Sequence, residues 1–87
     1  MKKITMFLLK SCPHCKAALS WMDELYEENA EYRDLEIEMI DEKAHPQIAN
    51  QYDYYYVPTY YVDNEKLHEG VASLKKIRQV FNAALEK

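Results

Sequence analysis

Residues 10–19 read KSCPHCKAAL and hold the only two cysteines of the chain, Cys12 and Cys15. Proline follows Cys12 directly, and proline is favoured at the first position of a helix because its missing N–H would find no partner there. The motif is therefore expected to open a helix that runs from Pro13 to about Glu28. Its apolar residues recur at intervals of three and four, as on one buried face: Cys15, Ala18, Leu19, Met22, Leu25 and Tyr26.

Strand and helix patterns alternate around this motif. Lys3–Leu9 is a short apolar run that predicts a strand buried on both faces. Glu36–Ile40 alternates charged and apolar residues, which indicates a second strand. The pair His45-Pro46 then opens a short helix to about Tyr52, and Asp53 is expected to close it in a left-handed conformation.

The C-terminal part predicts a hairpin and a last helix. Thr59–Val62 is rich in β-branched and aromatic residues, and a tight turn at Asp63-Asn64 joins this strand to a fourth at Lys66–Glu69. Ser73 caps a helix with one apolar stripe: Leu74, Ile77, Val80, Phe81, Ala84 and Leu85. The order β-α-β-α-β-β-α predicts an α/β fold, with a four-stranded mixed sheet and helices on both faces.

Length, composition and charge narrow the class of protein. The 87 residues suffice for one domain over residues 1–87. With 11 basic and 15 acidic residues, the chain has no basic stripe for a nucleic acid. It also has no run of about 20 apolar residues that could span a membrane. The apolar run Ile4–Leu9 is shorter than the roughly 7–15 residues of a secretion signal, so we expect a cytoplasmic protein. We also expect a monomer, because the chain needs no partner to complete its fold.

The position of each cysteine predicts its chemistry. In a reducing cytosol a lone close pair of cysteines is more often catalytic or metal-binding than structural. Cys12 occupies the capping position, where the amides of His14 and Cys15 and the helix dipole favour a thiolate. Cys15 lies one turn further on, in the buried stripe and within reach of Cys12. Cys12 is therefore the predicted nucleophile and Cys15 the predicted resolving thiol.

The two residues between the cysteines are predicted to tune the pair. Pro13 stiffens the loop at the start of the helix. His14 lies on the exposed side, and its N–H or its positive charge would favour the thiolate of Cys12. The alternative for His14 is a surface histidine with no role.

The cysteine motif at a strand–helix junction and the later segment VPTYYVDNEKLHEG, residues 57–70, resemble the thioredoxin and glutaredoxin superfamily over nearly all of the chain. The dipeptide Pro13-His14 looks like that of bacterial disulfide oxidases, whereas the short length is glutaredoxin-like. The resemblance implies a thioredoxin fold with a cis bond between Val57 and Pro58. It also implies that this loop faces the cysteines, and that the backbone of Val57 pairs with an extended substrate.

Several positions depart from the family patterns. Met6 stands where thioredoxins carry a buried aspartate. Lys10 is two residues before Cys12, whereas the glutathione-binding lysine of glutaredoxins is three residues before; it stays a candidate substrate contact. Val71 and Ser73 stand where glutaredoxins have a glycine and the aspartate that binds glutathione. Dedicated glutathione binding is therefore not expected.

Tyrosines are concentrated between residues 52 and 61. Tyr54, Tyr60 and Tyr61 are expected to fill core and strand positions, with each hydroxyl reaching an edge or water. Tyr56 directly precedes the Val57-Pro58 loop, where it could form an aromatic wall beside Cys12 that selects apolar or extended peptides. The alternative for Tyr56 is packing like that of its neighbours.

These features predict a thiol–disulfide oxidoreductase that reduces or exchanges disulfides of protein or small-molecule partners through Cys12 and Cys15. It needs no cofactor besides this redox-active pair, and either glutathione or a flavin-dependent reductase would supply the electrons. One alternative is a glutaredoxin-like protein that binds a metal or an iron–sulfur cluster, but zinc usually needs four ligands and the three histidines are scattered. The other alternative is a non-enzymatic adaptor, which the intact cysteine pair argues against.

Overall fold

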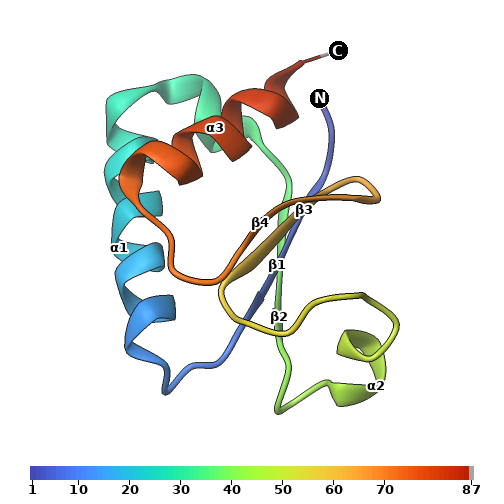
Figure 1. Ribbon diagram of the computed structural model, residues 1–87. Helices are drawn as coiled ribbons and strands as arrows, with labels where there is room; N and C mark the ends of the chain where they lie inside the picture. Colours follow the sequence, from blue (N-terminus) through green and yellow to red (C-terminus); the bar gives the residue numbers. More distant parts are fainter. Residues whose placement is uncertain (87) are drawn as a thin grey trace.

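One mixed sheet forms the centre of the computed structural model, which describes residues 1–86 (Figure 1). Its strands are β1 (Ile4–Leu8), β2 (Ile37–Asp41), β3 (Thr59–Val62) and β4 (Glu65–Glu69). They lie in the order β2-β1-β3-β4. β1 runs parallel to β2 and antiparallel to β3, and β3 and β4 form an antiparallel hairpin. The central strand, β1, is buried along its whole length, as its apolar sequence predicts.

Helices cover both faces of this sheet. α1 (Pro13–Glu28) and α3 (Leu74–Leu85) pack side by side on one face, and the short α2 (Pro46–Ala49) lies on the other (Figure 1). A 3₁₀ turn, η1 (Ala30–Asp34), follows α1. The predicted order β-α-β-α-β-β-α and the four-stranded mixed sheet are confirmed. The parallel β1–β2 pair brings the C-terminal ends of both strands to one edge, where the cysteine loop begins.

The prediction was wrong at the end of α2. This helix stops at Ala49, and Asn50 keeps an ordinary right-handed conformation. Among the described non-glycine residues, the positive φ angle belongs to Asp63, at 54° in the β3–β4 turn, and not to Asp53. The chain leaves the helix early because the Tyr52 ring packs 4.6 Å from the ring of Phe7 on the sheet.

Alternation along β1 divides the core into two layers. Ile4, Met6 and Leu8 face α1 and α3, in a cluster that also buries Cys15. Phe7 faces the other way and is fully buried beneath α2. Its ring lies 4.8 Å from Tyr54 and 6.0 Å from Tyr61 as well as near Tyr52, so aromatic rings fill this smaller layer. Aromatic pairs at such distances contribute about 0.5–1.5 kcal/mol beyond the area that they bury.

A capping side chain begins both α3 and η1. The hydroxyl of Ser73 accepts the N–H of Lys76 at 3.1 Å, which confirms the predicted cap of α3. The side chain of Asn29 accepts the N–H of Glu31 at 3.0 Å and so begins η1, an element that was not predicted. Asparagine is a strong capping residue, so this signal was present in the sequence.

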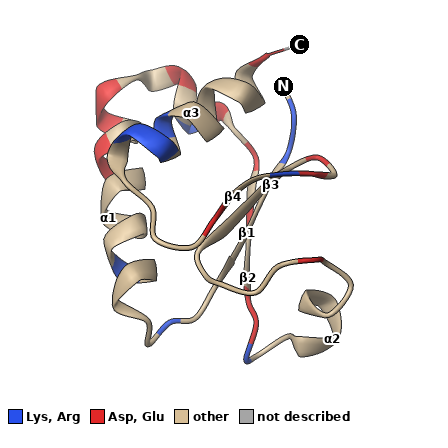
Figure 2. Ribbon diagram, viewed as in Figure 1, with Lys and Arg blue, Asp and Glu red and all other residues tan. Residues whose placement is uncertain are grey.

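No charged side chain among residues 1–86 is buried, and Figure 2 shows where the charged residues fall along the chain. The acidic end of α1 lies beside the basic first half of α3, and Arg78 joins them through an ion pair with Glu28 at 2.7 Å. Exposed pairs of this kind contribute roughly 0–1 kcal/mol to stability. Within residues 1–86, no helix has the length and apolar character needed to cross a lipid bilayer.

Candidate active site

Cys12 ends the loop between β1 and α1. Its backbone is extended, with φ −80° and ψ 122°, and it occupies the N-cap of α1 with Pro13 directly inside the helix. The N–H of Cys12 donates to the carbonyl of Leu9 at 3.0 Å, and its own carbonyl accepts from Cys15 and Lys16, each at 3.1 Å. Hydrogen bonds on both sides therefore fix the backbone that carries the partly exposed thiol.

Cys15 lies one turn further along α1 and faces the core. Its side chain is only 1% exposed, and its Sγ accepts the N–H of Leu9 at 3.5 Å. Burial first, and then the neighbouring Cys12, raise the pKa of the Cys15 thiol to about 11, although the N–H of Leu9 opposes this shift. At neutral pH Cys15 is therefore a protonated thiol next to the more exposed Cys12.

The pKa of Cys12 is shifted the opposite way. The backbone N–H of Cys15 lowers the pKa of Cys12 most, partial burial opposes this shift, and the backbone N–H of His14 lowers it further. The direction agrees with the prediction, but the predicted capping bond does not form, since the thiol accepts no hydrogen bond of regular geometry from the first turn. The amide dipoles act on Cys12 by proximity. The imidazole of His14 is exposed, and its role stays a prediction.

The loop before β3 has the predicted backbone. The bond between Val57 and Pro58 is cis. Pro58 is buried, and its carbonyl accepts the N–H of Gly70 at 2.9 Å. Val57 is half-buried and packs against the same core cluster as Cys12, and also against the smaller cluster around Phe7.

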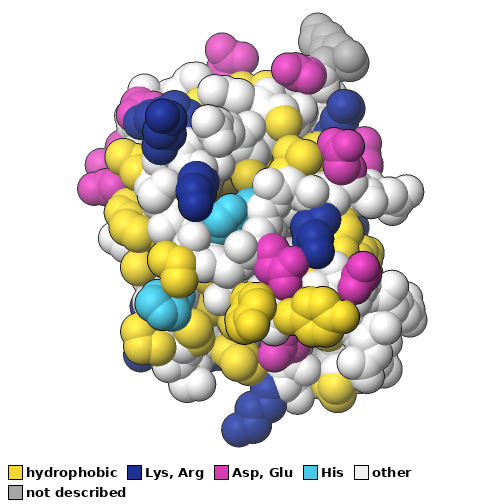
Figure 3. Space-filling model, viewed as in Figure 1, with side chains coloured by type: hydrophobic (Ala, Val, Ile, Leu, Met, Phe, Trp, Pro, Cys, Tyr) yellow, Lys and Arg dark blue, Asp and Glu magenta, His cyan; other side chains and the backbone are white. Residues whose placement is uncertain are grey.

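Exposed aromatic rings lie beside this loop. Tyr56 is 70% exposed, as a substrate contact requires, and Tyr55 is 85% exposed although it was not among the predicted contacts. Val71 is exposed as well, and Figure 3 shows apolar side chains gathered over the loops that precede α1 and β3. No local pattern marked the exposure of Tyr55, because residues 53–58 belong to no strand and their side chains do not alternate between core and surface.

The other tyrosines of this region are largely buried, as predicted. The hydroxyl of Tyr54 donates to Glu42 at 2.8 Å, and that of Tyr61 to the carbonyl of Asp53 at 2.7 Å. Tyr60 is fully buried and differs from the prediction, since its hydroxyl donates to the sulfur of Met22 at 3.3 Å and not to an edge or to water. The pKa of Tyr60 is raised chiefly by burial, with a further contribution from the charge of Cys15.

Lys10 lies two residues before Cys12, on the exposed turn that follows β1. Its N–H donates to a carboxylate oxygen of Asp41 at 3.3 Å. Together with Ser11 and Lys43, Lys10 lines a shallow hollow at the C-terminal ends of β1 and β2. Lys10 is therefore at the edge of the cysteine loop, and its contact with a substrate stays a prediction.

Glu42 is part of this site although it was not predicted. It follows β2, and its N–H donates to the carbonyl of Leu8 at 3.0 Å. The next residue, Leu9, is hydrogen-bonded to both Cys12 and Cys15. The negative charge of Glu42 raises the pKa of both Cys12 and Cys15. Parallel pairing of β1 and β2 is what brings this carboxylate to the cysteine loop.

A family model described as "Thioredoxin domain" matches residues 2–82. The chain belongs to the thioredoxin-domain family. A comparison with curated proteins finds no significant match.

Solved structures share the fold of this thioredoxin domain. Thioredoxin O1 from Arabidopsis thaliana, in its oxidised state, is 18% identical with a TM-score of 0.71, over 99% of this chain and 79% of that chain. A mutant thioredoxin from Halobacterium salinarum is 20% identical with a TM-score of 0.69, over 97% and 74% of the two chains. A thioredoxin-like protein from Clostridium perfringens is 23% identical with a TM-score of 0.68, over 98% and 71%.

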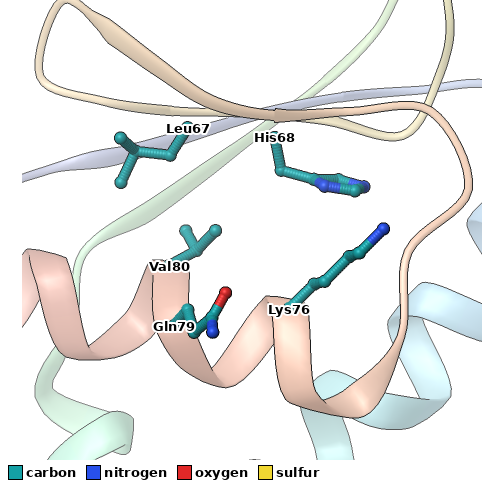
Figure 4. Close-up of a pocket in the computed structure, with 5 residues that line it drawn as sticks. All are labelled: Leu67, His68, Lys76, Gln79 and Val80. Carbon is teal, nitrogen blue, oxygen red and sulfur yellow. The ribbon is translucent and has the colours of Figure 1, made fainter.

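Two other features of this thioredoxin domain lie outside the cysteine site. A hollow between β4 and α3 is lined by Leu67, His68, Lys76, Gln79 and Val80, and neither cysteine reaches it (Figure 4). His68 there lies 3.0 Å from the carbonyl oxygen of Gly70 through its Nε2. Among residues 1–86, the structure brings together no group of three or more histidine, cysteine or acidic side chains that could hold a metal ion.

Proposed function

We propose that this thioredoxin domain is a two-cysteine thiol–disulfide oxidoreductase. The observation that carries the proposal is the opposite state of its two thiols. Cys12 is partly exposed with a lowered pKa, whereas Cys15 is buried with a pKa of about 11. Thiolates are the nucleophiles of disulfide exchange, so Cys12 attacks the substrate first, and Cys15 remains a protonated thiol until the second step.

Two exchange steps transfer two electrons to the substrate. In the first, the Cys12 thiolate attacks one sulfur of a disulfide, the S–S bond breaks, and the other sulfur leaves as a thiolate that takes a proton from water. In the second, Cys15 gives up its proton and attacks the Sγ of Cys12, which releases the second substrate thiol. The substrate is reduced to two thiols, and Cys12 and Cys15 are oxidised to a disulfide.

The same contacts explain why Cys15 reacts only in the second step. The charge of Cys12 helps to raise the pKa of Cys15, and that charge disappears when Cys12 enters a mixed disulfide. The pKa of Cys15 then falls, and its thiolate becomes available beside the bond that it must attack. The order of the two steps thus follows from electrostatics between neighbouring sulfurs.

The exposed surface around Cys12 suggests how a substrate is held. Tyr56 offers an apolar wall, and the backbone of Val57 beside Pro58 is suited to pair with an extended chain. Lys10, on the turn after β1, would bind a carboxylate group of the substrate. Substrates are then disulfides of proteins or small molecules, handled by a monomer in a reducing compartment such as the cytoplasm. Glutathione or a flavin-dependent reductase would restore the dithiol.

Substitution of each cysteine tests this proposal. We expect Cys12→Ser to abolish reduction of insulin disulfides by the protein in the presence of dithiothreitol. Cys15→Ser should instead accumulate a mixed disulfide, which intact mass spectrometry detects after an acid quench. Ser11→Ala, a change at the exposed neighbour of Cys12, is the matched control and should keep activity. Full turnover by Cys12→Ser would rule out the mechanism.

Equilibration in glutathione redox buffers tests the rival functions. A two-cysteine oxidoreductase should switch between dithiol and internal disulfide at a defined midpoint. A persistent glutathione adduct would indicate single-cysteine chemistry. A metal or cluster bound in native mass spectra that prevents the switch would favour the metal-binding alternative.

A further inference from the structure

The carboxylate of Glu69, at the end of β4, gathers donors from two parts of the chain. One oxygen accepts the backbone N–H of Tyr55 at 2.6 Å and that of Tyr56 at 3.0 Å. The other oxygen pairs with the ammonium group of Lys66 at 2.7 Å. A single side chain of the hairpin therefore binds two consecutive amides of the loop that leads to Val57.

Side chains of the hairpin hold the rest of this loop too. The carbonyl of Asp53 accepts from the hydroxyl of Tyr61 at 2.7 Å and from Lys66 at 3.2 Å. The carbonyl of Tyr56 accepts from the hydroxyl of Thr59. The segment from Asp53 to Tyr56 belongs to no helix or strand, so these contacts take the place of regular backbone pairing.

The charge of the Glu69 carboxylate strengthens its hydrogen bonds to the loop. Lys66 and then the amide of Tyr55 lower the pKa of Glu69 to about 2, so the carboxylate is ionised throughout the neutral range. Hydrogen bonds from an amide to an ionised acceptor are roughly twice as strong as neutral ones. Glutamine at this position would keep the shape of the side chain and lose the charge.

We propose that Glu69 is a positioning residue, which fixes the backbone at Tyr55 and Tyr56 so that their rings form one wall of the substrate surface beside Cys12. The inference rests on the proposed function and adds the element that sets specificity for protein disulfides. The two rings are largely exposed, so core packing does not place them and their positions follow from the backbone. Tyr56 is also close to Gly70. A Cβ atom added to Gly70 would lie 3.8 Å from the Cβ atom of Tyr56.

The substrate class follows from the chemistry of this wall. Two adjacent phenol rings beside a nucleophilic thiol favour a polypeptide whose cysteine is flanked by apolar or aromatic side chains. A small aryl disulfide reaches Cys12 without needing the wall. Loss of the Glu69 contacts should therefore weaken the reaction with a peptide disulfide and leave the reaction with a small aryl disulfide unchanged.

The test compares Glu69→Gln in the full chain with wild type, on a peptide disulfide flanked by phenylalanines and on 5,5′-dithiobis(2-nitrobenzoate). We expect KM for the peptide to rise about three- to tenfold with kcat unchanged, which is the range for losing one ordinary hydrogen bond, because glutamine keeps an acceptor oxygen and loses the charge. The rate with the aryl disulfide should stay the same. Amide hydrogen exchange at Tyr55 and Tyr56 should become faster. Glu65→Gln, an exposed change on the same strand, is the control and should match wild type.

A double-mutant cycle makes the inference sharper. Tyr55→Ala combined with Tyr56→Ala should raise the peptide KM similarly, and adding Glu69→Gln should cause little further loss if all three act as one unit. An unchanged peptide KM in Glu69→Gln would overturn the inference, as would an equal loss on both substrates. Should Glu69→Gln not fold, Glu69→Asp, which keeps the charge but withdraws the carboxylate from the two amides by one methylene, carries the same test: the peptide KM should rise and the rate with the aryl disulfide should not change. Failure of wild type to react with the aryl disulfide would instead overturn the proposed function.

Discussion

The hydroxyl of Tyr54 donates a 2.8 Å hydrogen bond to the carboxylate of Glu42, at the edge of the sheet where the cysteine loop begins. Tyr54 is itself held against Phe7, with the two rings stacked 4.8 Å apart. The bond therefore fixes a negative charge near two thiols. It also raises the pKa of Tyr54, after burial, because the neighbouring carboxylate disfavours a phenolate.

Removal of the Glu42 charge should make Cys12 more acidic. The carboxylate raises the pKa of Cys12, so Glu42→Gln should lower that pKa and increase the thiolate fraction at neutral pH. The pH dependence of thiolate absorbance at 240 nm, recorded in a Cys15→Ser background, measures the shift. Glu38→Gln, an exposed change on β2, is the matched control. An unchanged titration in Glu42→Gln would contradict this prediction.

Alkylation should distinguish the two thiols. With iodoacetamide in slight excess near pH 8, we expect Cys12 to be carboxamidomethylated first, because the pKa of Cys15 is about 11 and its side chain is buried. Peptide mapping by mass spectrometry after a time course identifies the labelled residue. In urea both thiols should react at similar rates, which controls for intrinsic reactivity. Preferential labelling of Cys15 in the native protein would refute the assigned roles.

The stability contribution of Glu69 should depend on pH. Its pKa is about 2 in the folded protein and about 4.3 in an unfolded chain, so its ionised form stabilises the fold above the unfolded value. The difference in unfolding midpoint between wild type and Glu69→Gln should be constant above pH of about 5 and shrink as pH falls toward about 2. Urea titrations measure it through the fluorescence of Trp21, the single tryptophan of the chain, which lies on α1 and packs against the core. A difference that grows on acidification would show the sign to be wrong.

Two core substitutions should have very different costs. Phe7 is fully buried among three tyrosine rings, so Phe7→Ala should lower the free energy of unfolding by about 3–5 kcal/mol through the cavity that it leaves. Tyr60→Phe removes a hydroxyl whose acceptor is only a thioether, and the change should be within about 1 kcal/mol. Urea unfolding compares both with wild type. A larger loss for Tyr60→Phe would show that its hydroxyl has a stronger role than this contact indicates.

The sequence by itself determined the elements and the cysteine chemistry where the signals are local. Proline after Cys12 begins α1 at Pro13, and Ser73 caps α3, since capping depends on a few adjacent residues. Alternation and apolar spacing predicted the strands to within about two residues, because burial patterns repeat along one element. The spacing of Cys12 and Cys15 likewise set which thiol is exposed and which is buried.

Only the tertiary structure decided which distant groups act on this site. Glu42 meets Tyr54, and Glu69 meets Tyr55 and Tyr56, across turns of the chain that no local pattern encodes. The early end of α2 has the same origin, since Tyr52 leaves the helix to pack on Phe7. Such contacts depend on strand order and register, which bring together residues far apart in sequence. The physical reason is that a side chain's charge and hydrogen bonds act through space, whereas the patterns read from a sequence act along the chain.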